Sequence, residues 1–201
     1  MPDEQSEDPG ARLMVAWQGG DEEAFDRLVE GYSGRVYALL TRFLGRHPGR
    51  EDLVQETFLR VVRARERYAP SARFTTWLYS IVYHLAVNET QRSAGRTPVS
   101  IDRPSAGEGH DATSLELVDD AAADPSDGLA REDVVQAVRT AIASLPENQR
   151  MALVLAKYEE LPYLEIGSIL GSSEKAVKSL IHRARETLRT RLASFLEEEL
   201  A

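Results

Sequence analysis

A break in the apolar pattern between Gly95 and Gly128 constrains the fold of this chain more than any other feature of its sequence. The stretch consists largely of Gly, Pro, Ser, Ala and Asp, and its apolar residues show little periodicity. Such a composition is typical of a flexible linker. On both sides of it, apolar residues recur at spacings of three and four, which is the pattern of amphipathic helices. The sequence therefore predicts an all-α protein with two small helical domains and an acidic linker over residues 96–128.

The first predicted domain covers residues 11–95 and follows an acidic segment, residues 1–10, which we expect to be a disordered tail. Gly45 with Pro48, and later Pro70, interrupt its apolar pattern at points where a helix is expected to end. Four helices with short connections predict a compact helical bundle. We expect these helices to begin near Ala11, Asp21, Arg50 and Phe74.

The second predicted domain covers residues 129–195. Pro146 suits the first turn of a helix, because a proline there loses no intrahelical hydrogen bond. Gly171 to Ser173 has the composition of a tight turn between a short helix and a long one. We expect helices over residues 129–144, 146–159 and 161–170, and a long helix after the turn.

The net charge of −9 would argue against a nucleic-acid partner if it were spread evenly over the chain. Residues 1–10 hold four acidic residues and no basic one, and residues 100–130 hold eight acidic residues and one basic one. Residues 57–99 have seven basic and two acidic residues, and residues 171–193 have six basic and two acidic ones. Local basic tracts, rather than total charge, decide whether a protein can contact phosphates. Two such tracts are present, one in each predicted domain.

The segment from Phe74 to Arg92 combines an apolar helix face with an unusual polar face. Aromatic rings, amides and a cation on one strip are the groups that stack bases, recognise base edges and bind phosphates of single-stranded nucleic acid. A plain core helix with surface tyrosines would contain the same residues, so both readings stay open at this point. The apolar face consists of Phe74, Trp77, Leu78, Ile81, Val82 and Leu85, and the polar face of Tyr79, Tyr83, His84, Asn88, Gln91 and Arg92.

A helix-turn-helix motif is predicted over residues 161–189. Gly167 is small where two helices would cross closely, and Ser173 can cap the second helix, whose first amides would then face a phosphate. In such motifs the second helix presents its first turns to base edges in duplex DNA. The alternative is a solvated basic face on a core helix. The outward positions are Glu174, Lys175, Lys178, Ser179, His182, Arg183, Arg185 and Arg189.

The helix predicted over residues 50–67 has an exposed side that does not suit DNA. An exposed leucine among acidic and amide groups favours a protein partner that offers cations and an apolar groove. An ordinary solvated helix face is the alternative. The predicted cluster is Asp52, Gln55, Glu56 and Leu59, and the predicted buried stripe is Val54, Phe58, Val61 and Val62.

Catalysis receives no support from the sequence. The chain has no cysteine, which excludes disulfides and thiolate zinc sites, and its four histidines are scattered without ligand spacing. There is no glycine-rich phosphate loop of either common type. We therefore expect no enzyme activity, no catalytic residue, no metal and no cofactor. Without a signal peptide or a long apolar run, a soluble cytoplasmic protein is expected.

Three segments together resemble the extracytoplasmic-function group of sigma factors, small members of the sigma-70 family that contain only regions 2 and 4. The segment DLVQETFLRVVRA, from Asp52 to Ala64, is similar to region 2.2. The segment FTTWLYSIVYHLAVNETQR, from Phe74 to Arg92, is similar to regions 2.3 and 2.4. Residues 144–189 resemble region 4. The resemblance covers both predicted domains and implies a transcription initiation factor rather than an enzyme.

The resemblance implies that the first domain binds both polymerase and promoter. Asp52, Gln55, Glu56 and Leu59 would dock on the clamp helices of the β′ subunit of core RNA polymerase. The loop from Tyr68 to Phe74 and the helix after it would open the −10 element and hold a flipped base, at a cost in stacking that the pocket must repay. The residues implied in −10 binding are Tyr68, Phe74, Trp77, Tyr79, Tyr83, His84, Asn88 and Arg92.

For the second domain, the resemblance implies binding of the −35 element in the major groove and contact with the polymerase β flap. The linker would run toward the RNA channel of the polymerase. An anti-sigma factor would cover these surfaces and hold the protein inactive, and no small-molecule substrate is implied. The residues implied in −35 binding are Ser173, Lys175, Lys178, Ser179, His182, Arg183 and Arg185.

The sequence departs from the family pattern at three positions. His84 stands where an asparagine is frequent, which leaves the identity of the −10 base open. Ala176 and Leu180 replace the common Thr and Arg of the recognition helix. Leu180 follows the buried stripe, so we expect it to pack inward and to remove one phosphate contact.

Two other functions are compatible with the residues alone. One is a regulator that binds duplex DNA without polymerase and uses residues 11–95 as an oligomerisation or ligand module. The other is a pure interaction protein, such as an antagonist mimic, which would bind polymerase or a sigma partner and support no initiation. The first would bind duplex DNA on its own, whereas a sigma factor would act only with core enzyme.

Overall fold

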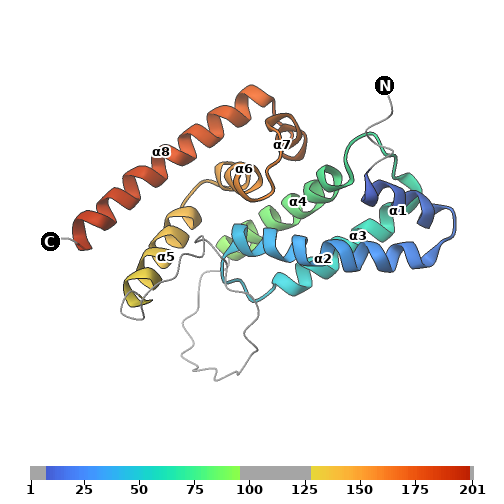
Figure 1. Cartoon of the computed structure of the whole chain (residues 1–201), viewed down its shortest axis with the longest axis horizontal. Coiled ribbons are helices and arrows are strands. Elements are labelled where there is room, and N and C mark those ends of the chain that lie inside the picture. Colours follow the sequence, from blue (N-terminus) through green and yellow to red (C-terminus); the bar gives the residue numbers. More distant parts are fainter. Residues whose placement is uncertain (1–7, 96–127, 200–201) are drawn as a thin grey trace, which may run out of the picture.

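The computed structural model describes residues 8–95 and 128–199, which form α-helices and no strands. The predicted linker over residues 96–128 lies outside the described residues, except for Gly128. Figure 1 shows the helices in two groups, with α7 of the second group packed against α4 of the first and α6 against α2. The helices are α1 (Pro9–Gln18), α2 (Glu22–Leu44), α3 (Arg50–Ala64), the 3-10 turn η2 (Arg65–Arg67), α4 (Phe74–Gly95), α5 (Gly128–Ala143), α6 (Glu147–Tyr158), α7 (Tyr163–Leu170) and α8 (Glu174–Glu199).

Helix α1 begins at Pro9, so residues 8–10 are structured and the prediction of a tail through residue 10 is corrected. The carboxylate of Asp8 accepts hydrogen bonds from the amides of Gly10 at 3.0 Å and Ala11 at 3.3 Å. Its second oxygen accepts from the amide of Phe74 at 2.6 Å. One side chain thus satisfies amides at the N-termini of two helices, α1 and α4. A side chain at Gly10 would overlap the Phe74 ring, because a Cβ there would lie 2.3 Å from that ring.

Helix α2 follows Asp21 as predicted, α4 buries Tyr79 in addition to its predicted apolar face, and α3 differs in which of its valines is buried. Leu53 and Thr57 are buried, and the Thr57 hydroxyl donates to the Leu53 carbonyl at 2.7 Å. Val62 is 42% exposed, although it was predicted in the buried stripe. Val61 is completely buried, and Val62 points about 100° away from it on the helix, at the exposed edge of the buried side. Val54 is half-buried.

The helix-turn-helix predicted in the second domain is present as α7, a three-residue turn and α8. Gly171 ends α7 in the left-handed conformation, with φ of 61°, which glycine adopts without steric cost. Ser173 caps α8, since its hydroxyl accepts from the amide of Ala176 at 3.2 Å. A Cβ at Gly167 would lie 2.7 Å from the carbonyl oxygen of Ser172, so this close approach requires glycine.

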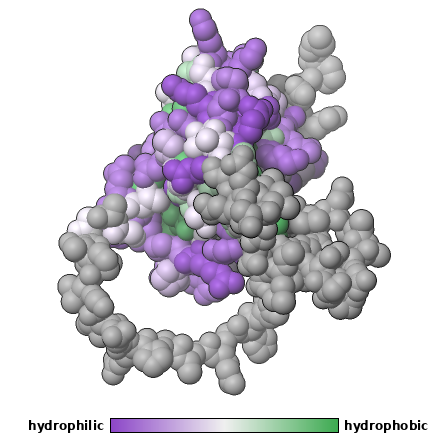
Figure 2. Space-filling view, turned by 90° about the vertical axis from the view of Figure 1, so that its left-hand side faces the viewer, coloured by the Kyte–Doolittle hydropathy of each residue, from purple (hydrophilic) through white to green (hydrophobic). Residues whose placement is uncertain are grey.

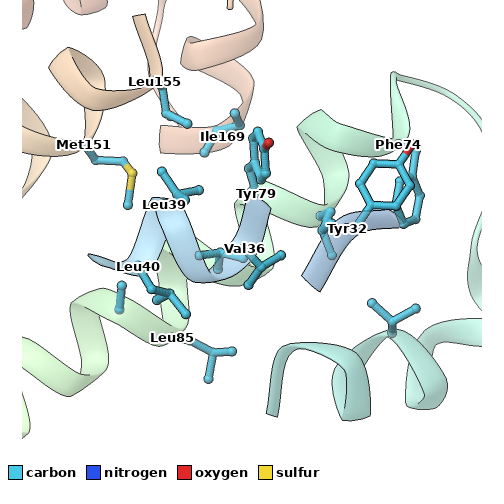
Figure 3. Packing of buried hydrophobic residues seen from close by; sticks show 14 of the residues in the cluster. Tyr32, Val36, Leu39, Leu40, Phe74, Tyr79, Leu85, Met151, Leu155 and Ile169 are labelled. Carbon is cyan, nitrogen blue, oxygen red and sulfur yellow. The ribbon is translucent and has the colours of Figure 1, made fainter. Parts of the chain in front are cut away.

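Most buried apolar side chains of the described residues belong to one cluster that extends through both groups of helices. Figure 3 shows Met151, Leu155 and Ile169 of the second group facing Leu39 and Tyr79 of the first. All five side chains are almost completely buried. The two predicted domains are therefore packed against one another in this structure. We call this contact the seam.

The surface of the described residues is mostly polar, and Figure 2 shows hydrophilic side chains over most of one side with small hydrophobic areas between them. Within residues 8–95 and 128–199, no helix is both long enough and apolar enough to span a membrane.

Candidate nucleic-acid interface

The outer face of α8 presents every side chain predicted to contact duplex DNA. Ser173 lies at its cap, and the other six residues lie on the first three turns and point away from α6 and α7. Leu180 is half-buried and packs against the core, as predicted from its place on the apolar stripe. Ser173, Lys175, Lys178, Ser179, His182, Arg183 and Arg185 are all exposed.

The cations on this face have no ion-pair partners in the part of the chain that the structure describes. No carboxylate there lies within ion-pair distance of Lys178, Arg183 or Arg185. The Ser179 hydroxyl donates to the carbonyl of Lys175 at 3.1 Å within the helix. Unpaired cations beside a capped helix N-terminus can bind phosphates on either side of a groove.

Helix α4 carries a stripe of four hydroxyl groups, which we call the hydroxyl stripe. Its members follow one another at spacings of three, four and seven and therefore share one side of the helix. Each donates a hydrogen bond to an acceptor on the second domain, so the stripe is occupied rather than open. The members are Thr76, Tyr79, Tyr83 and Thr90, and their acceptors are Glu165, Glu159, Asn148 and Glu147, respectively.

Tyr79 is the central member of the stripe and is 1% exposed. Its hydroxyl donates to Glu159 at 2.5 Å, and the same carboxylate lies 3.4 Å from the guanidinium of Arg42. Burial raises the pKa of Tyr79 well above its ordinary value, and the hydrogen bond to Glu159 raises it further. The hydroxyl therefore remains a donor at neutral pH. The prediction that Tyr79 lies on an open polar face is not met in this arrangement, because the second domain covers it.

The last turns of α4 remain open. His84, Asn88 and Arg92 are exposed, as a nucleic-acid contact requires. The Nδ1 atom of His84 lies 2.6 Å from the carbonyl oxygen of Ser80, and its ring meets the Tyr83 ring edge-on at 5.4 Å between centroids. These contacts restrain the orientation of the exposed His84 ring.

Three aromatic residues predicted to contact the −10 element pack together instead of facing solvent. Phe74 is completely buried and Tyr68 is 7% exposed, while Trp77 is half-buried. The Tyr68 and Trp77 rings meet edge-on at 4.9 Å, and Tyr32 meets Phe74 at 4.8 Å. Contact of Phe74 with DNA conflicts with its place in the core, since its ring anchors α4 beneath α1. Burial raises the pKa of Tyr68 to about 12.

The predicted partner-facing cluster on α3 is open to solvent. Asp52 and Gln55 are exposed, Leu59 is 49% exposed, and Val62 extends the same apolar surface. Glu56 is half-exposed and pairs with Arg60 and Arg63 on its own helix, at 3.1 and 3.3 Å. The hydrogen bond from Arg60 lowers the pKa of Glu56. The sequence did not show that Val62 is exposed, because adjacent residues on a helix point about 100° apart and both can be buried, as Leu39 and Leu40 are on α2.

Several polar residues at the seam were not identified from the sequence. Arg35 and Arg73 line a cavity of about 450 Å³ together with Tyr79 and Glu159. Arg73 also pairs with Glu165 at 3.8 Å. Nothing in the local pattern marks these residues, because their partners lie in the other domain.

Comparison with known proteins agrees with this arrangement. The sigma-70 region 2 family model matches residues 28–96, and the sigma-70 region 4 model matches residues 135–188. These segments contain α3 and α4 in the first domain and the helix-turn-helix in the second.

Curated relatives and a solved structure extend the match to most of the chain. The chain is 31% identical to the ECF RNA polymerase sigma factor SigW of Bacillus subtilis, over 86% of this chain and 91% of SigW. It is 34% identical to the ECF RNA polymerase sigma-E factor of Salmonella typhimurium, over 88% and 90%. CnrH, solved in complex with the cytosolic domain of CnrY, has a similar fold, with a TM-score of 0.64 at 22% identity over 93% of this chain and 99% of that one. The chain belongs to the sigma-70 family, as a member of the extracytoplasmic-function group of RNA polymerase sigma factors.

Proposed function

We propose that this chain binds core RNA polymerase and directs it to a set of promoters, with three separate faces for three tasks. The α3 face docks on the polymerase, the α4 face opens and reads the −10 element, and the α8 face reads the −35 element. The observation that carries the proposal is the presence, in one chain, of an exposed basic helix-turn-helix and an aromatic, hydroxyl-bearing helix face. The first suits duplex DNA and the second a separated strand.

The α8 face fits the −35 role because its side chains can serve two kinds of contact. Lys178, Ser179 and His182 lie on the first turns, where a recognition helix meets base edges. Arg183 and Arg185 lie further along, and their exposed guanidinium groups suit phosphate contacts. Base contacts would determine sequence preference, and phosphate contacts would determine affinity and salt dependence.

The α4 face fits the −10 role because it offers rings and polar groups along about three turns of helix. Tyr83, His84 and Asn88 can stack on a base or bond to its edge, and Arg92 can neutralise a phosphate. Tyr79 joins this set only when the second domain moves away from it. Phe74 and Tyr68 pack in the core beneath α4. They would affect DNA binding only by positioning that helix.

The α3 face fits a protein partner rather than DNA. Leu59 and Val62 expose apolar surface beside the carboxylate of Asp52. A basic helical surface with an apolar groove would complement it, and the β′ clamp helices are the site that the family resemblance implies. Region 4 would also contact the β flap.

An anti-sigma factor that covers these faces would control the protein. The sigma factor RpoE of Bartonella quintana, which has a similar fold with a TM-score of 0.59 at 22% identity, was solved in complex with the anti-sigma factor NepR and supports this proposal. The chain itself would carry out no catalysis and would need no cofactor or small-molecule substrate. Its site of action would be the cytoplasm, where core polymerase works.

Run-off transcription with purified core polymerase on a library of genomic fragments tests the proposal. We expect promoter-specific products that appear only when this chain is added. A duplex-binding regulator would bind fragments without polymerase and yield no product, and an interaction protein would bind polymerase and yield none. Absence of a specific product from every fragment would refute the sigma function.

The docking face has a matched control elsewhere on the surface. We expect Gln55→Ala combined with Leu59→Ala to weaken binding to core polymerase and to leave the fold intact, because both side chains are exposed. Val15→Ala, on α1, removes an apolar side chain that is equally exposed, at 49%. Core affinity, measured by fluorescence anisotropy, should fall only for the first variant. Unchanged affinity would place the docking face elsewhere.

A further inference from the structure

The segment over residues 65–74 joins α3 to α4, and the family resemblance implies that its loop holds a flipped base of the −10 element. Its middle, residues 69–73, which we call the loop tip, is exposed throughout. Inside the tip, the amide of Ser71 donates to the carbonyl of Ala69 at 2.8 Å. One local bond cannot order the whole tip, so its shape depends on how the two ends of the segment are held.

Gln18, the last residue of α1, holds the start of this segment. Its side-chain nitrogen donates to the carbonyl of Arg65 at 2.6 Å and to the carbonyl of Tyr68 at 3.0 Å. An amide nitrogen carries two hydrogens, so both bonds can form at the same time. The two carbonyls lie 47 and 50 residues further along the chain. Their orientation is therefore set by α1 and not only by their own neighbours.

The side chain of Arg65 fastens the same end of the segment. Its guanidinium lies over the Trp17 ring, 4.5 Å from the ring centre, and donates to the Trp17 carbonyl. It also pairs with Glu22 at 3.0 Å, and the Trp17 indole nitrogen donates to the same carboxylate at 2.9 Å. Backbone and side chain of Arg65 are thus both bound to the end of α1.

Asp8, the residue before α1, holds the other end of the segment. One oxygen of its carboxylate accepts from the amides of Gly10 and Ala11, and the second accepts from the amide of Phe74 at 2.6 Å. Hydrogen bonds to a charged acceptor are stronger than those between neutral groups. The Phe74 ring is completely buried and packs closely on Gly10. The two ends of α1 therefore hold the two ends of the segment that carries the loop tip.

These contacts all lie within the first domain. Helix α1 packs against α2, η2 and α4 (Figure 1). The loop tip also reaches the second domain, where Arg73 pairs with Glu165 at 3.8 Å. The bonds made by Asp8 and Gln18 do not involve the seam, so they can persist in any arrangement of the two domains.

We propose that Asp8 and Gln18 are positioning residues for promoter opening, and that α1 is a clamp that keeps the loop tip in the shape that accepts a flipped base. The inference rests on the proposed function for the role of the loop, and on the α1 contacts for its mechanism. A flipped base must regain from its pocket the free energy lost on unstacking. A pocket that is already ordered loses no further conformational entropy when the base enters.

Two substitutions loosen the clamp with little change in side-chain size. In Asp8→Asn, the remaining carbonyl oxygen can still cap α1, because asparagine is a favoured cap residue. The new amide group then meets the Phe74 amide, which is also a donor, so that bond is lost. Gln18→Met keeps the length of the side chain and removes both donors. Each variant therefore releases one end of the segment.

The first test measures the loop tip in the full chain without DNA. The chain has no cysteine, so Ser71→Cys provides a unique site for a spin label in the tip. We expect a restrained label in the otherwise unchanged chain and a more mobile one with Asp8→Asn/Gln18→Met. The control, Asp26→Asn/Gln136→Met, makes the same chemical changes at exposed positions of α2 and α5 and should leave the label restrained. Equal mobility with both pairs of substitutions would overturn the clamp.

The second test uses the holoenzyme at a promoter identified by run-off transcription. We expect Asp8→Asn and Gln18→Met each to slow strand opening about threefold to tenfold, which corresponds to one lost hydrogen bond. Each should also reduce the preference among the four bases at the flipped position. Affinity for core polymerase and for closed promoter DNA should be unchanged, because neither residue lies on the α3 or α8 face.

Base preference separates positioning from a merely structural role. A structural role would lower the melting temperature and leave the wild-type base preference intact at temperatures well below melting, and that result would refute the inference. Gln18→Met leaves the cap of α1 intact and keeps the proposal testable if Asp8→Asn does not fold. A wild-type chain that never initiates, with label mobility as predicted, would refute the proposed function and leave the clamp standing.

Discussion

Helices α4 and α8 both carry residues suited to nucleic acid, but the structure leaves one face open and covers much of the other. On the outer face of α8, Lys178, Arg183 and Arg185 are exposed and have no ion-pair partner among the described residues. On α4, Tyr79 is buried and Tyr83 is bonded to Asn148, while His84 and Asn88 stay exposed. A helix that reads duplex DNA is thus available at once. A helix that holds a separated strand is available only in part.

The difference has a physical reason. A basic helix face is stable in contact with water, because its charges are well hydrated. A face with tyrosines at its centre gains free energy when those rings are buried and their hydroxyls are bonded. In this chain the second domain buries the ring of Tyr79 and supplies acceptors for the hydroxyl stripe. Residues that make a good single-strand site therefore also make a good domain contact.

The largest effect on affinity for promoter DNA is expected from substitutions on α8. Lys178→Ala combined with Arg183→Ala removes one candidate base contact, worth about 1–3 kcal/mol if fully formed, and one candidate phosphate contact, whose loss weakens binding to every sequence further. Affinity of the holoenzyme for promoter DNA should fall about 10- to 1000-fold, with a shallower salt dependence. Gel-shift titrations at several salt concentrations measure both. A loss of less than about threefold would mean that this face does not bind DNA.

The next effect concerns the turn that positions α8. Gly167→Ala places a Cβ 2.7 Å from the Ser172 carbonyl oxygen, and the turn must shift to accept it. We expect a loss of about 1–3 kcal/mol in the free energy of unfolding, and weaker −35 binding with core affinity unchanged.

Gly34→Ala is the control for this prediction, because nothing lies within 4 Å of a Cβ at that position. Denaturant unfolding compares the two variants. Equal stability of both would show that α7 and the turn are more loosely packed than described.

A substitution at Tyr68 tests whether this residue serves only the core or also contacts DNA. Its hydroxyl is buried and has no hydrogen-bond partner among the described residues. Tyr68→Phe should therefore stabilise the fold by up to about 1 kcal/mol. It should leave initiation unchanged if the ring serves only the core, whereas reduced initiation with intact stability would restore Tyr68 to the DNA-binding set.

The same substitution predicts a pH effect. The folded pKa of Tyr68 is about 12, above the ordinary value of about 10, so the folded state retains the proton longer than the unfolded state does. Its contribution to stability is complete below pH of about 10 and is lost as the pH rises toward 12. The difference in melting temperature between Tyr68→Phe and wild type should widen over that range. A constant difference would contradict the burial of the hydroxyl.

The smallest effect is expected for His84→Asn. Both residues can bond to a base edge, so we expect altered base preference at one −10 position with little change in total activity. Transcription from templates that carry each of the four bases there measures it. Identical preference for wild type and variant would remove His84 from the pocket.

The local pattern of the sequence was sufficient to predict the helices and the outer face of α8. The positions predicted to face outward on α8 are exposed, and Val177, Ile181 and Ala184 between them are buried. Gly171 and Ser173 correctly marked the turn. These features depend on neighbours a few residues apart, which the sequence shows directly.

Features that depend on distant partners could not be predicted. The cap that Asp8 provides to the amides of Gly10 and Ala11 is local, but its bond to the amide of Phe74, 66 residues away, could not be predicted. The covering of Tyr79 depends on Glu159, 80 residues further along and beyond the linker. The sequence shows that residue 79 is a tyrosine and residue 159 a glutamate. It does not show that the two pair, because many acidic residues could have reached the same hydroxyl.

The division of labour between α4 and α8 is tested most directly by strand opening at a promoter identified by run-off transcription. Permanganate oxidises unpaired thymines, so it reports opening of the −10 element in the complex with core polymerase. We predict reactive thymines with the wild-type chain, and none with Tyr83→Ala/Asn88→Ala, although that variant still holds the promoter through α8. Strand opening by this variant at the wild-type level would contradict the account, as would a wild-type complex that binds the promoter and leaves it closed.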